Sequence, residues 1–291
     1  MDETKSTGER LYTGYFDRYS LEHLHRYAVA QSFATGKAVL DIASGEGYGS
    51  NLLADVASNV IGVDIDPEII AHATKRYSKA NLKFLQGSTD QIPVAASSID
   101  VVVSFETLEH HDRHEEMYSE IKRVLAPGGL LIVSTPDKKY FSDLTGHRND
   151  FHIKELYKEE FISLTRKHFR YFTLSSQVSS VASILCGEND AESFRVFGGN
   201  HHDIYSDQVF RDPAYHICIA SDIPVPTISA SVFESRNILD THHVEIDVLQ
   251  HRISELTRVN KDLRQSVSYR LGRALVTPFR LFARVISGRG G

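Results

Sequence analysis

Residues 37–50, KAVLDIASGEGYGS, decide the fold of this chain. An apolar run that ends at Ile42 is followed by glycines at every second position, Gly45, Gly47 and Gly49. This order predicts a buried parallel strand, a tight turn and the start of a helix. Glycine permits positive φ in such a turn and lets the backbone approach a bulky ligand closely. The stretch therefore predicts a cofactor-binding strand, turn and helix.

Two side chains in this stretch bear on the identity of the cofactor. A dinucleotide fingerprint has its third glycine where Ser50 stands here. Asp41 places a carboxylate at the end of the strand, where it would repel a pyrophosphate and favour a cationic ligand. S-adenosylmethionine carries a sulfonium and an ammonium, so the stretch favours it over a dinucleotide. A tight turn that binds no ligand is the alternative from these residues alone.

The next predicted strand begins at Val60 and ends at Asp64. In a Rossmann-like sheet an acid at this place holds the two hydroxyls of a ribose. Asp66 and Pro67 follow and are typical of a helix N-cap and a first helical residue. We therefore expect Asp64 to bind a ligand and Asp66 to begin a helix.

Four ordered segments resemble the class I S-adenosylmethionine-dependent methyltransferases. They are VLDIASGEGYGS, VIGVDIDPE, the region from FLQGSTDQIP to IDVVVSFETLEHH, and VLAPGGLLIVSTP. The resemblance covers about residues 8–233 and implies an α/β fold, a Rossmann-like doubly wound sheet of seven strands. The segments EHLHRY, SFETLEHH and NDFHIKELYKEEF are similar to the subgroup that works beside glycosyltransferases in bacterial surface-polysaccharide (O-antigen-type) assembly.

The resemblance assigns a donor site to residues spread over the first half of the chain. The predicted cofactor-binding residues are Asp41, Ser44, Gly45, Gly47, Asp64, Ile65, Ser88, Thr89, Phe105, Glu106 and Tyr27. Many relatives place an aspartate after Gly87 to accept from the adenine amino group, and here that role is open between Ser88, Asp90 and a backbone carbonyl. Glu106 can face the cofactor's positive charge, and a helix-start acid is its alternative. The resemblance also implies that the segment around Tyr27 covers the cofactor pocket. The alternative is that this segment is a solvent-exposed helix face.

Two histidines after the predicted strand at residues 99–105 are candidates for a general base. An imidazole beside the transferred methyl group could take a proton from an acceptor hydroxyl, because its pKa lies near working pH. His110 is our first choice for this catalytic role and His111 the second, and a structural role for both is the alternative.

The acceptor is expected to bind further along the chain. Residues 138–150 have too few regular apolar positions for an element and are interpreted as a lid before a helix at 155–168. Asn149, His152 and Lys154 are predicted to bind the acceptor. Strands at 169–175 and 214–220 are expected to pair antiparallel at the sheet edge, with an insertion at about 178–212 shaping access.

Composition limits the other classes of function. The 291 residues carry a net charge of −6, and the two cysteines and scattered histidines show no zinc-ligand spacing, so neither a disulfide framework nor a metal is expected. No signal peptide and no run of about 18 uncharged apolar residues occurs, which predicts a cytoplasmic protein. The acidic balance of the globular part disfavours nucleic acid as a partner.

The end of the chain has a different pattern. After the methyltransferase domain at 1–233 and a linker at 234–242, residues 243–267 carry apolar side chains at alternating steps of three and four. This heptad predicts a coiled coil that makes a homo-oligomer, with a dimer favoured over a trimer and a helix packed on the domain as the alternative. The basic amphipathic tail at 268–291 is predicted to lie on an anionic membrane, as in a peripheral protein, or to dock on a partner such as a glycosyltransferase. A tail that binds nothing is the alternative.

The resemblance to the glycosyltransferase-associated subgroup implies a methyltransferase that acts on a sugar hydroxyl or phosphate of a surface glycan. A small phenol or quinone-like acceptor is the alternative within the class. From another class, a non-catalytic scaffold for glycan-assembly enzymes would explain the oligomerising tail, and a nicotinamide oxidoreductase is a third option.

Overall fold

A computed structural model describes residues 18–179, 183–187, 196–199, 204–207 and 213–233. The predicted linker, the coiled coil at 243–267 and the basic tail at 268–291 lie outside the described residues. Among the described residues, no helix combines the length and the apolar character that crossing a bilayer requires.

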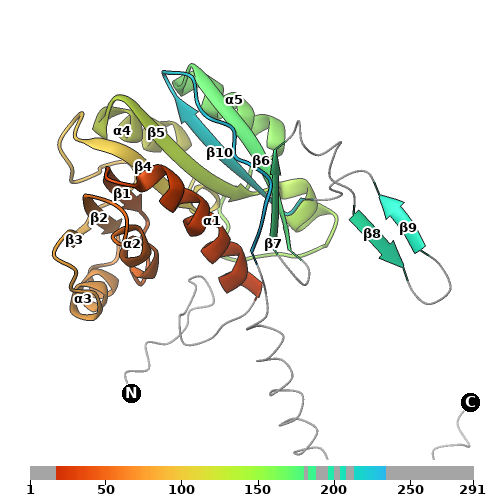
Figure 1. Ribbon diagram of the computed structural model, residues 1–291, viewed down its shortest axis with the longest axis horizontal. Helices are drawn as coiled ribbons and strands as arrows, with labels where there is room; N and C mark the ends of the chain where they lie inside the picture. The colour runs from red at the N-terminus through yellow and green to blue at the C-terminus, as the bar shows by residue number, and fades with distance from the viewer. Residues whose placement is uncertain (1–17, 180–182, 188–195, 200–203, 208–212, 234–291) are drawn as a thin grey trace, which may run out of the picture. The chain divides into compact units, whose positions relative to one another are not determined.

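A nine-stranded mixed sheet runs through the domain (Figure 1) in the order β11-β7-β6-β10-β5-β4-β1-β2-β3. Its strands are β1 (Ala38–Ile42), β2 (Asn59–Asp64), β3 (Leu82–Gln86), β4 (Ile99–Phe105), β5 (Leu125–Pro136), β6 (Tyr171–Ser179), β7 (Ser183–Gly187), β10 (Tyr215–Ser221) and β11 (Ser231–Phe233). The first five strands pair in parallel, whereas β10 is antiparallel to both β5 and β6. A separate hairpin pairs β8 (Val196–Gly199) with β9 (Ile204–Asp207).

The prediction of seven strands is wrong by two. The strands β6 and β10 pair antiparallel as expected, but β7 and β11 extend the sheet beyond β6, so this pair is not at the edge. The strand β7 lies inside the segment interpreted as an insertion. Its sequence, SILCG, is too short for a clear alternation, and contacts far along the chain hold it: the Ser183 hydroxyl lies 2.9 Å from the Nδ1 atom of His25.

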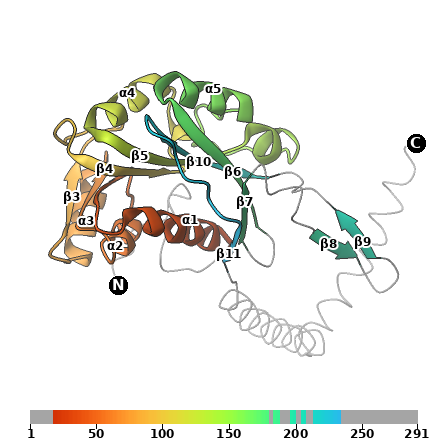
Figure 2. The ribbon, with the colours of Figure 1, turned by 45° about the horizontal axis from the view of Figure 1, so that its top comes forward.

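Helices cover both faces of the sheet (Figure 2). On one face lie α1 (Arg18–Ala34) and α2 (Tyr48–Leu53), and on the other lie α4 (His114–Val124) and α5 (Lys158–His168). A further helix, α3 (Pro67–Arg76), packs on β2 and β3. In β4, Val101 and Val103 enter the core under α1, whereas Val102 enters the core under α4. This is why the strand is apolar at nearly every position.

The helix ends follow the local chemistry of the sequence. The N-cap of α3 is confirmed, because the Asp66 carboxylate accepts from the backbone N–H groups of Glu68 and Ile69 at 2.9 and 3.4 Å, and Pro67 is the first helical residue. The prediction that residues 138–150 contain no element is corrected, because a single π-helical turn, η2 (Lys139–Asp143), forms there.

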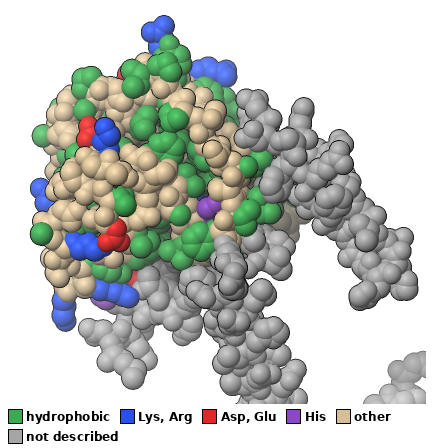
Figure 3. All heavy atoms as spheres, in the orientation of Figure 1, with side chains coloured by type: hydrophobic (Ala, Val, Ile, Leu, Met, Phe, Trp, Pro, Cys, Tyr) green, Lys and Arg blue, Asp and Glu red, His purple; other side chains and the backbone are tan. Residues whose placement is uncertain are grey.

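In the view of Figure 3, hydrophobic side chains reach the surface in separate groups among uncharged atoms.

Candidate active site

A cavity of about 460 Å³ opens at the carboxyl ends of β1, β2 and β4. In an open α/β sheet, ligands bind where the strand order reverses, which here is between β1 and β4. The cavity is lined by the residues that follow these strands and β3, and by two residues of α1, His23 and Tyr27. Its volume is that of a site for a small molecule or cofactor.

The glycines after β1 have separate structural tasks. Gly45 has a φ of +53°, and a Cβ atom built there would meet nothing within 4 Å, so its backbone borders open space in the cavity. Gly47 has a φ of +84°, and a Cβ atom there would lie 2.6 Å from the ring of Phe84. Gly45 therefore offers its backbone to a ligand, whereas Gly47, which does not line the cavity, lets α2 pack closely on the sheet.

Asp64 is held in one orientation at the end of β2. Its two carboxylate oxygens accept from the backbone N–H groups of Gly45 and Asp66 at 2.9 and 3.0 Å. The side chain is almost fully buried but borders the cavity, together with the exposed Ile65. A fixed carboxylate beside an apolar side chain and an open glycine backbone fits the ribose and base of a nucleoside.

Asp41 lies behind this wall. It is buried and does not line the cavity, and it accepts a hydrogen bond from Ser50 at 2.6 Å and a longer one from Tyr27 at 3.3 Å. Burial raises the pKa of the Asp41 carboxyl to about 7, and these hydrogen bonds offset part of that rise. Asp41 therefore positions the ring of Tyr27, which does line the cavity, and has no direct path to a ligand.

The loop after β3 closes another side of the cavity. Ser88, Thr89 and Asp90 all border it, together with Arg113, the residue before α4. Asp90 is paired with Arg113, and a hydrogen bond from Ser88 is the largest cause that lowers the pKa of the Asp90 carboxyl. No local sequence signal marks Arg113, because its contact to Asp90 joins a loop and a helix that are not adjacent in the chain.

Glu106 follows β4 in a left-handed conformation with a φ of +50°. Its carboxylate accepts from the Ser134 hydroxyl at 2.6 Å and lies 3.3 Å from the buried guanidinium of Arg26 in α1. The helix that follows is only a 3₁₀ turn, η1 (Leu108–His110), so a helix dipole does not explain the acid. Non-glycine residues in this conformation are strained, and such strain gathers at functional sites.

The two candidate bases differ in their surroundings. His111 accepts a hydrogen bond from the backbone N–H of Arg113 at 3.2 Å, and burial lowers the pKa of His111 to about 4. His110 has its Nδ1 atom 3.1 Å from the carbonyl oxygen of Phe151 and its Nε2 atom 3.9 Å from a carboxylate oxygen of Glu109. Both rings line the cavity, and His110 also faces Glu109, a carboxylate that the sequence pattern does not single out.

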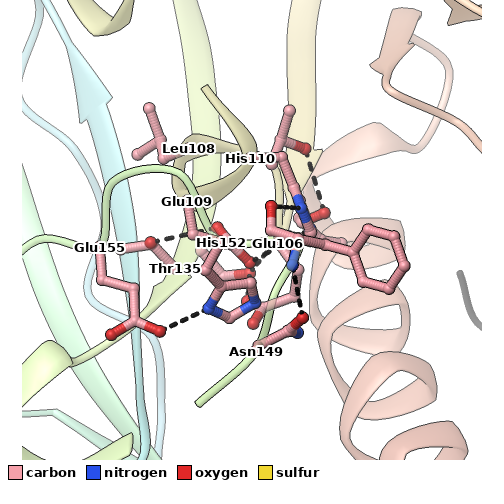
Figure 4. A network of polar contacts seen from close by, with 12 residues as sticks. Glu106, Leu108, Glu109, His110, Thr135, Asn149, His152 and Glu155 are labelled. Atoms are coloured by element: carbon pink, nitrogen blue, oxygen red, sulfur yellow. Dashed lines mark hydrogen bonds and ion pairs between the residues drawn. The ribbon is translucent and has the colours of Figure 1, made fainter. Parts of the chain in front are cut away.

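Beside His110, Glu109 and His152 form a second polar layer, with Glu155 on the far side of the His152 ring (Figure 4). Glu109 is buried and accepts from Thr135 at 3.3 Å, and burial, followed by the charge of Glu106, raises the pKa of Glu109 well above its usual value. The Nδ1 atom of His152 lies 2.5 Å from the Glu155 carboxylate. The rings of His110 and His152 lie 5.2 Å apart, edge to face.

The three residues predicted to bind the acceptor therefore have different places. His152 is brought against His110, with the two rings in contact. Asn149 instead uses its side chain to accept from the backbone N–H of Phe151 at 3.0 Å. The side chain of Lys154 is exposed. Of the three, His152 is thus the one whose ring is joined to the histidine that lines the cavity.

Backbone hydrogen bonds hold the loop that carries these residues. The N–H groups of Ile153 and Lys154 both donate to the carbonyl oxygen of Glu109, at 2.8 and 3.0 Å. Because Glu109 belongs to η1, these two bonds fix the loop against that turn and keep His152 beside it.

Further residues at the cavity were also not predicted to bind. His23 and Tyr48 both line it, and the Nδ1 atom of His23 lies 3.1 Å from the Tyr48 hydroxyl. Burial lowers the pKa of His23 to about 3, so this ring is neutral near pH 7. The EHLHRY segment was the available signal, because it places His23 one helical turn before Tyr27.

Comparisons with known proteins agree with this geometry. The family described as "Methyltransferase domain" matches residues 40–133. A protein of Mycolicibacterium smegmatis named "Probable S-adenosylmethionine-dependent methyltransferase" is 35% identical over 198 residues, which are 67% of this chain and 74% of that protein. The "Fatty-acid O-methyltransferase" of the same organism is 30% identical over 126 residues, which are 43% of this chain and 46% of that protein.

A solved structure shares the fold. It is the complex between the Haloferax volcanii Trm112 methyltransferase activator and a protein assigned as a methyltransferase, and the match has a TM-score of 0.52. The identity is 19%, and the match covers 73% of this chain and 92% of the matched chain. At this level of identity the likeness concerns the fold alone.

Proposed function

We propose that this chain, which belongs to the S-adenosylmethionine-dependent methyltransferases, transfers the methyl group to a hydroxyl oxygen that binds beside His110. The single observation that carries this proposal is the position of the His110 ring. It lines the cavity after β4, and its Nδ1 atom faces the Phe151 carbonyl at 3.1 Å. A carbonyl beside Nδ1 favours the tautomer with the proton on that atom, which leaves Nε2 to accept a proton from the acceptor.

The donor half of the cavity would hold the cofactor through residues already in place. Asp64 would accept the ribose hydroxyls, the Gly45 backbone would lie against the amino-acid part, and Ile65 would cover the base. When bound, S-adenosylmethionine supplies a methyl group on a sulfonium, which an oxygen nucleophile displaces directly. The chain's contribution is to align the hydroxyl with that methyl group, to exclude water and to take the proton.

The class of the acceptor has two candidates. A sugar hydroxyl or phosphate of a surface glycan is favoured by the sequence segments that resemble the glycosyltransferase-associated subgroup. No relative described above is named for action on a glycan, so this candidate rests on the sequence segments alone.

An acceptor with an apolar body is favoured by a different observation. The segment that brings His152 to His110 also exposes large apolar side chains, with Leu144 64%, Phe151 41% and Ile153 69% exposed. Apolar side chains of this size at the surface are typical of binding sites when they gather near a pocket. One relative is named as a fatty-acid O-methyltransferase, and a fatty acid has an apolar body of this kind.

Turnover of methyl-labelled S-adenosylmethionine tests the proposal. The panel pairs glycans and phosphoglycans with fatty acids, long-chain alcohols and phenols, and includes amines as a contrast. We expect transfer to an oxygen acceptor that fails in His110→Gln while binding of S-adenosylhomocysteine is kept. Transfer to amines, carboxylates or phosphates alone, whose acceptor atoms need no His110 base, or full activity of His110→Gln on a hydroxyl acceptor, would contradict the proposal. An absence of cofactor binding would favour the scaffold alternative.

A further inference from the structure

Three side chains of metal-ligand type meet at the acceptor side of the cavity. Glu109 and His110 come from η1, and His152 comes from the loop before α5. One ligand atom from each lies within 4.8 Å of the other two. In a tetrahedral site with bonds of roughly 2.0–2.2 Å the ligand atoms are about 3.4 Å apart, so a small inward movement of the side chains would close the cluster on a cation.

The outer contacts of the two imidazoles match those of metal-bound histidines. Such a histidine uses one ring nitrogen for the metal and donates from the other to a carboxylate or a backbone carbonyl. The Nδ1 atom of His152 faces the Glu155 carboxylate at 2.5 Å, and that of His110 faces the Phe151 carbonyl at 3.1 Å. In both rings Nε2 is therefore the atom to bind a metal, and in His110 it faces Glu109 at 3.9 Å.

The His152 ring is also held by packing. It stacks on the ring of Phe141 with 5.4 Å between the ring centres and 25° between the planes. Its side chain is only 8% exposed, as is that of Glu155. A ring that is both stacked and hydrogen-bonded is already oriented before it binds a ligand, which reduces the entropy lost on binding.

One buried guanidinium lies close to the cluster. The carboxylates of Glu22, Glu106 and Glu109 all act on one guanidinium, that of Arg26. Arg26 lies 3.3 Å from Glu106, and its Nε atom donates to Gln177 at 2.8 Å. Glu106 therefore engages Arg26, and Glu109 is the carboxyl group that lies beside the two imidazoles.

We propose that Glu109, His110 and His152 form a binding site for a divalent transition-metal cation at the acceptor side of the cavity. Two imidazoles and one carboxylate suit Zn²⁺ better than Mg²⁺ or Ca²⁺, which prefer oxygen ligands, and Mn²⁺ is expected to bind more weakly than Zn²⁺. The partly exposed edge of His110, which borders the cavity, gives the cation its access and leaves coordination positions that face the acceptor. The cation would occupy the same Nε2 atom of His110 that the proposed function uses as the base, so the metal-bound site and the base are alternative states of this residue. Use of the cation in polarising an acceptor hydroxyl rests on the proposed function.

Calorimetry on the full chain, first dialysed against EDTA, tests the site with Zn²⁺ and Mn²⁺ as probes. We expect one high-affinity equivalent per chain, and an anomalous scattering peak between the Nε2 atoms of His110 and His152 in crystals soaked with Zn²⁺. The substitution His152→Ala should lower the affinity by more than about 100-fold, since it removes a ligand. Glu155→Gln, which acts only through His152, should lower it by about 10- to 100-fold.

The exposed His147, whose ring lies 5.3 Å from that of Phe141, provides the matched control. His147→Ala should bind the cations as the wild type does, and all variants should keep their affinity for S-adenosylhomocysteine, which reports that the domain is folded. The proposal is overturned if neither cation binds the wild type, if His152→Ala and Glu155→Gln bind as tightly as the wild type, or if Mg²⁺ binds as tightly as Zn²⁺. Methyl transfer by the EDTA-treated protein would leave the proposed function standing while removing a catalytic use for the cation.

Discussion

The two halves of the cavity are built in different ways. The donor half consists of backbone turns at the ends of neighbouring parallel strands, with Asp64 fixed by the N–H groups of Gly45 and Asp66. The acceptor half consists of side chains that meet from distant segments, with His110 facing His152 across 42 positions of the sequence. The donor half is therefore fixed by local geometry, whereas the acceptor half depends on long-range packing.

This difference separates binding from chemistry. A rigid donor half serves a cofactor that is common to a whole family, and the acceptor half can vary with the substrate. Changes in the donor half should alter cofactor affinity, and changes in the acceptor half should alter the rate of transfer at unchanged cofactor affinity. The predictions below test this division.

The largest effect is expected in the acceptor half, from His110→Gln. Removing a general base lowers kcat by about 10²–10⁴-fold, while the affinity for S-adenosylhomocysteine should stay within about threefold because the donor half is untouched. His111→Gln is the comparison, and we expect it to lower kcat by less than about tenfold. If His111 were the base instead, wild-type activity would persist down to about pH 4, where burial places its pKa.

In the donor half, Asp64→Ala should weaken binding of S-adenosylhomocysteine by about 100-fold or more. The carboxylate would make two hydrogen bonds to the ribose, and bonds to charged groups contribute about 1.5–3 kcal/mol each. Isothermal titration calorimetry measures the loss. Asp66→Ala is the matched control, because it removes the cap of α3 and costs about 1 kcal/mol of stability without touching the cavity. Equal affinity of Asp64→Ala and the wild type would remove Asp64 from the ribose role.

Behind the donor half, Asp41 should give the stability a dependence on pH. Because burial raises the pKa of the folded-state carboxyl from 3.8 to about 7, the folded protein keeps a proton that the unfolded chain loses, and stability falls as pH rises between these values. Asp41→Asn removes this contribution. Urea unfolding at pH 5 and pH 8 measures the free energy of unfolding of both proteins. Relative to the wild type, the free energy of unfolding of the variant should be higher at pH 8 than at pH 5, by at most about 1.4 kcal/mol per pH unit. A constant difference between the two proteins would contradict the raised pKa.

The smallest effect is expected from Ala43→Gly in the loop after β1. Ala43 has a φ of +61°, a left-handed conformation that costs a residue with a Cβ atom about 1–2 kcal/mol. Glycine relieves that strain but adds about 0.5–1 kcal/mol of unfolded-state entropy. Thermal unfolding of the cofactor-free protein should show a gain of up to about 1 kcal/mol, whereas a loss would mean that the alanine methyl group makes a necessary contact.

The same division governs what the sequence could predict. Glycine spacing, Asp64 at a strand end and the cap at Asp66 are local signals, and the structure places Asp64 and Gly45 together at the cavity as expected. Asp41 is close in sequence to Gly45, yet its carboxylate does not line the cavity. Its direction is set by the hydrogen bonds from Tyr27 and Ser50, which the sequence pattern does not predict.

Long-range contacts limited the rest. Arg26 pairs with Glu106, which lies 80 positions further along the chain. The strand β7 has only five residues, so its sequence pattern is too short to predict that it joins the sheet. In SFETLEHH, Glu109 lies between Glu106 and His110, which are the more obvious candidates for a site. Glu109 comes close to His152 only because the loop before α5 folds back over η1. The spacing of cysteines and histidines along the chain predicts no metal, and it cannot report the proposed cluster, because the three residues of that cluster come together only in the fold.

A crystal structure of the full chain with S-adenosylhomocysteine provides the most direct test of the central claim. The claim is that the cavity binds the donor through Asp64 and the turn after β1 and directs its sulfur toward His110. The account predicts the ribose hydroxyls on the Asp64 carboxylate and the sulfur directed toward His110. A ribose bound away from Asp64, or a sulfur directed away from His110, would contradict it.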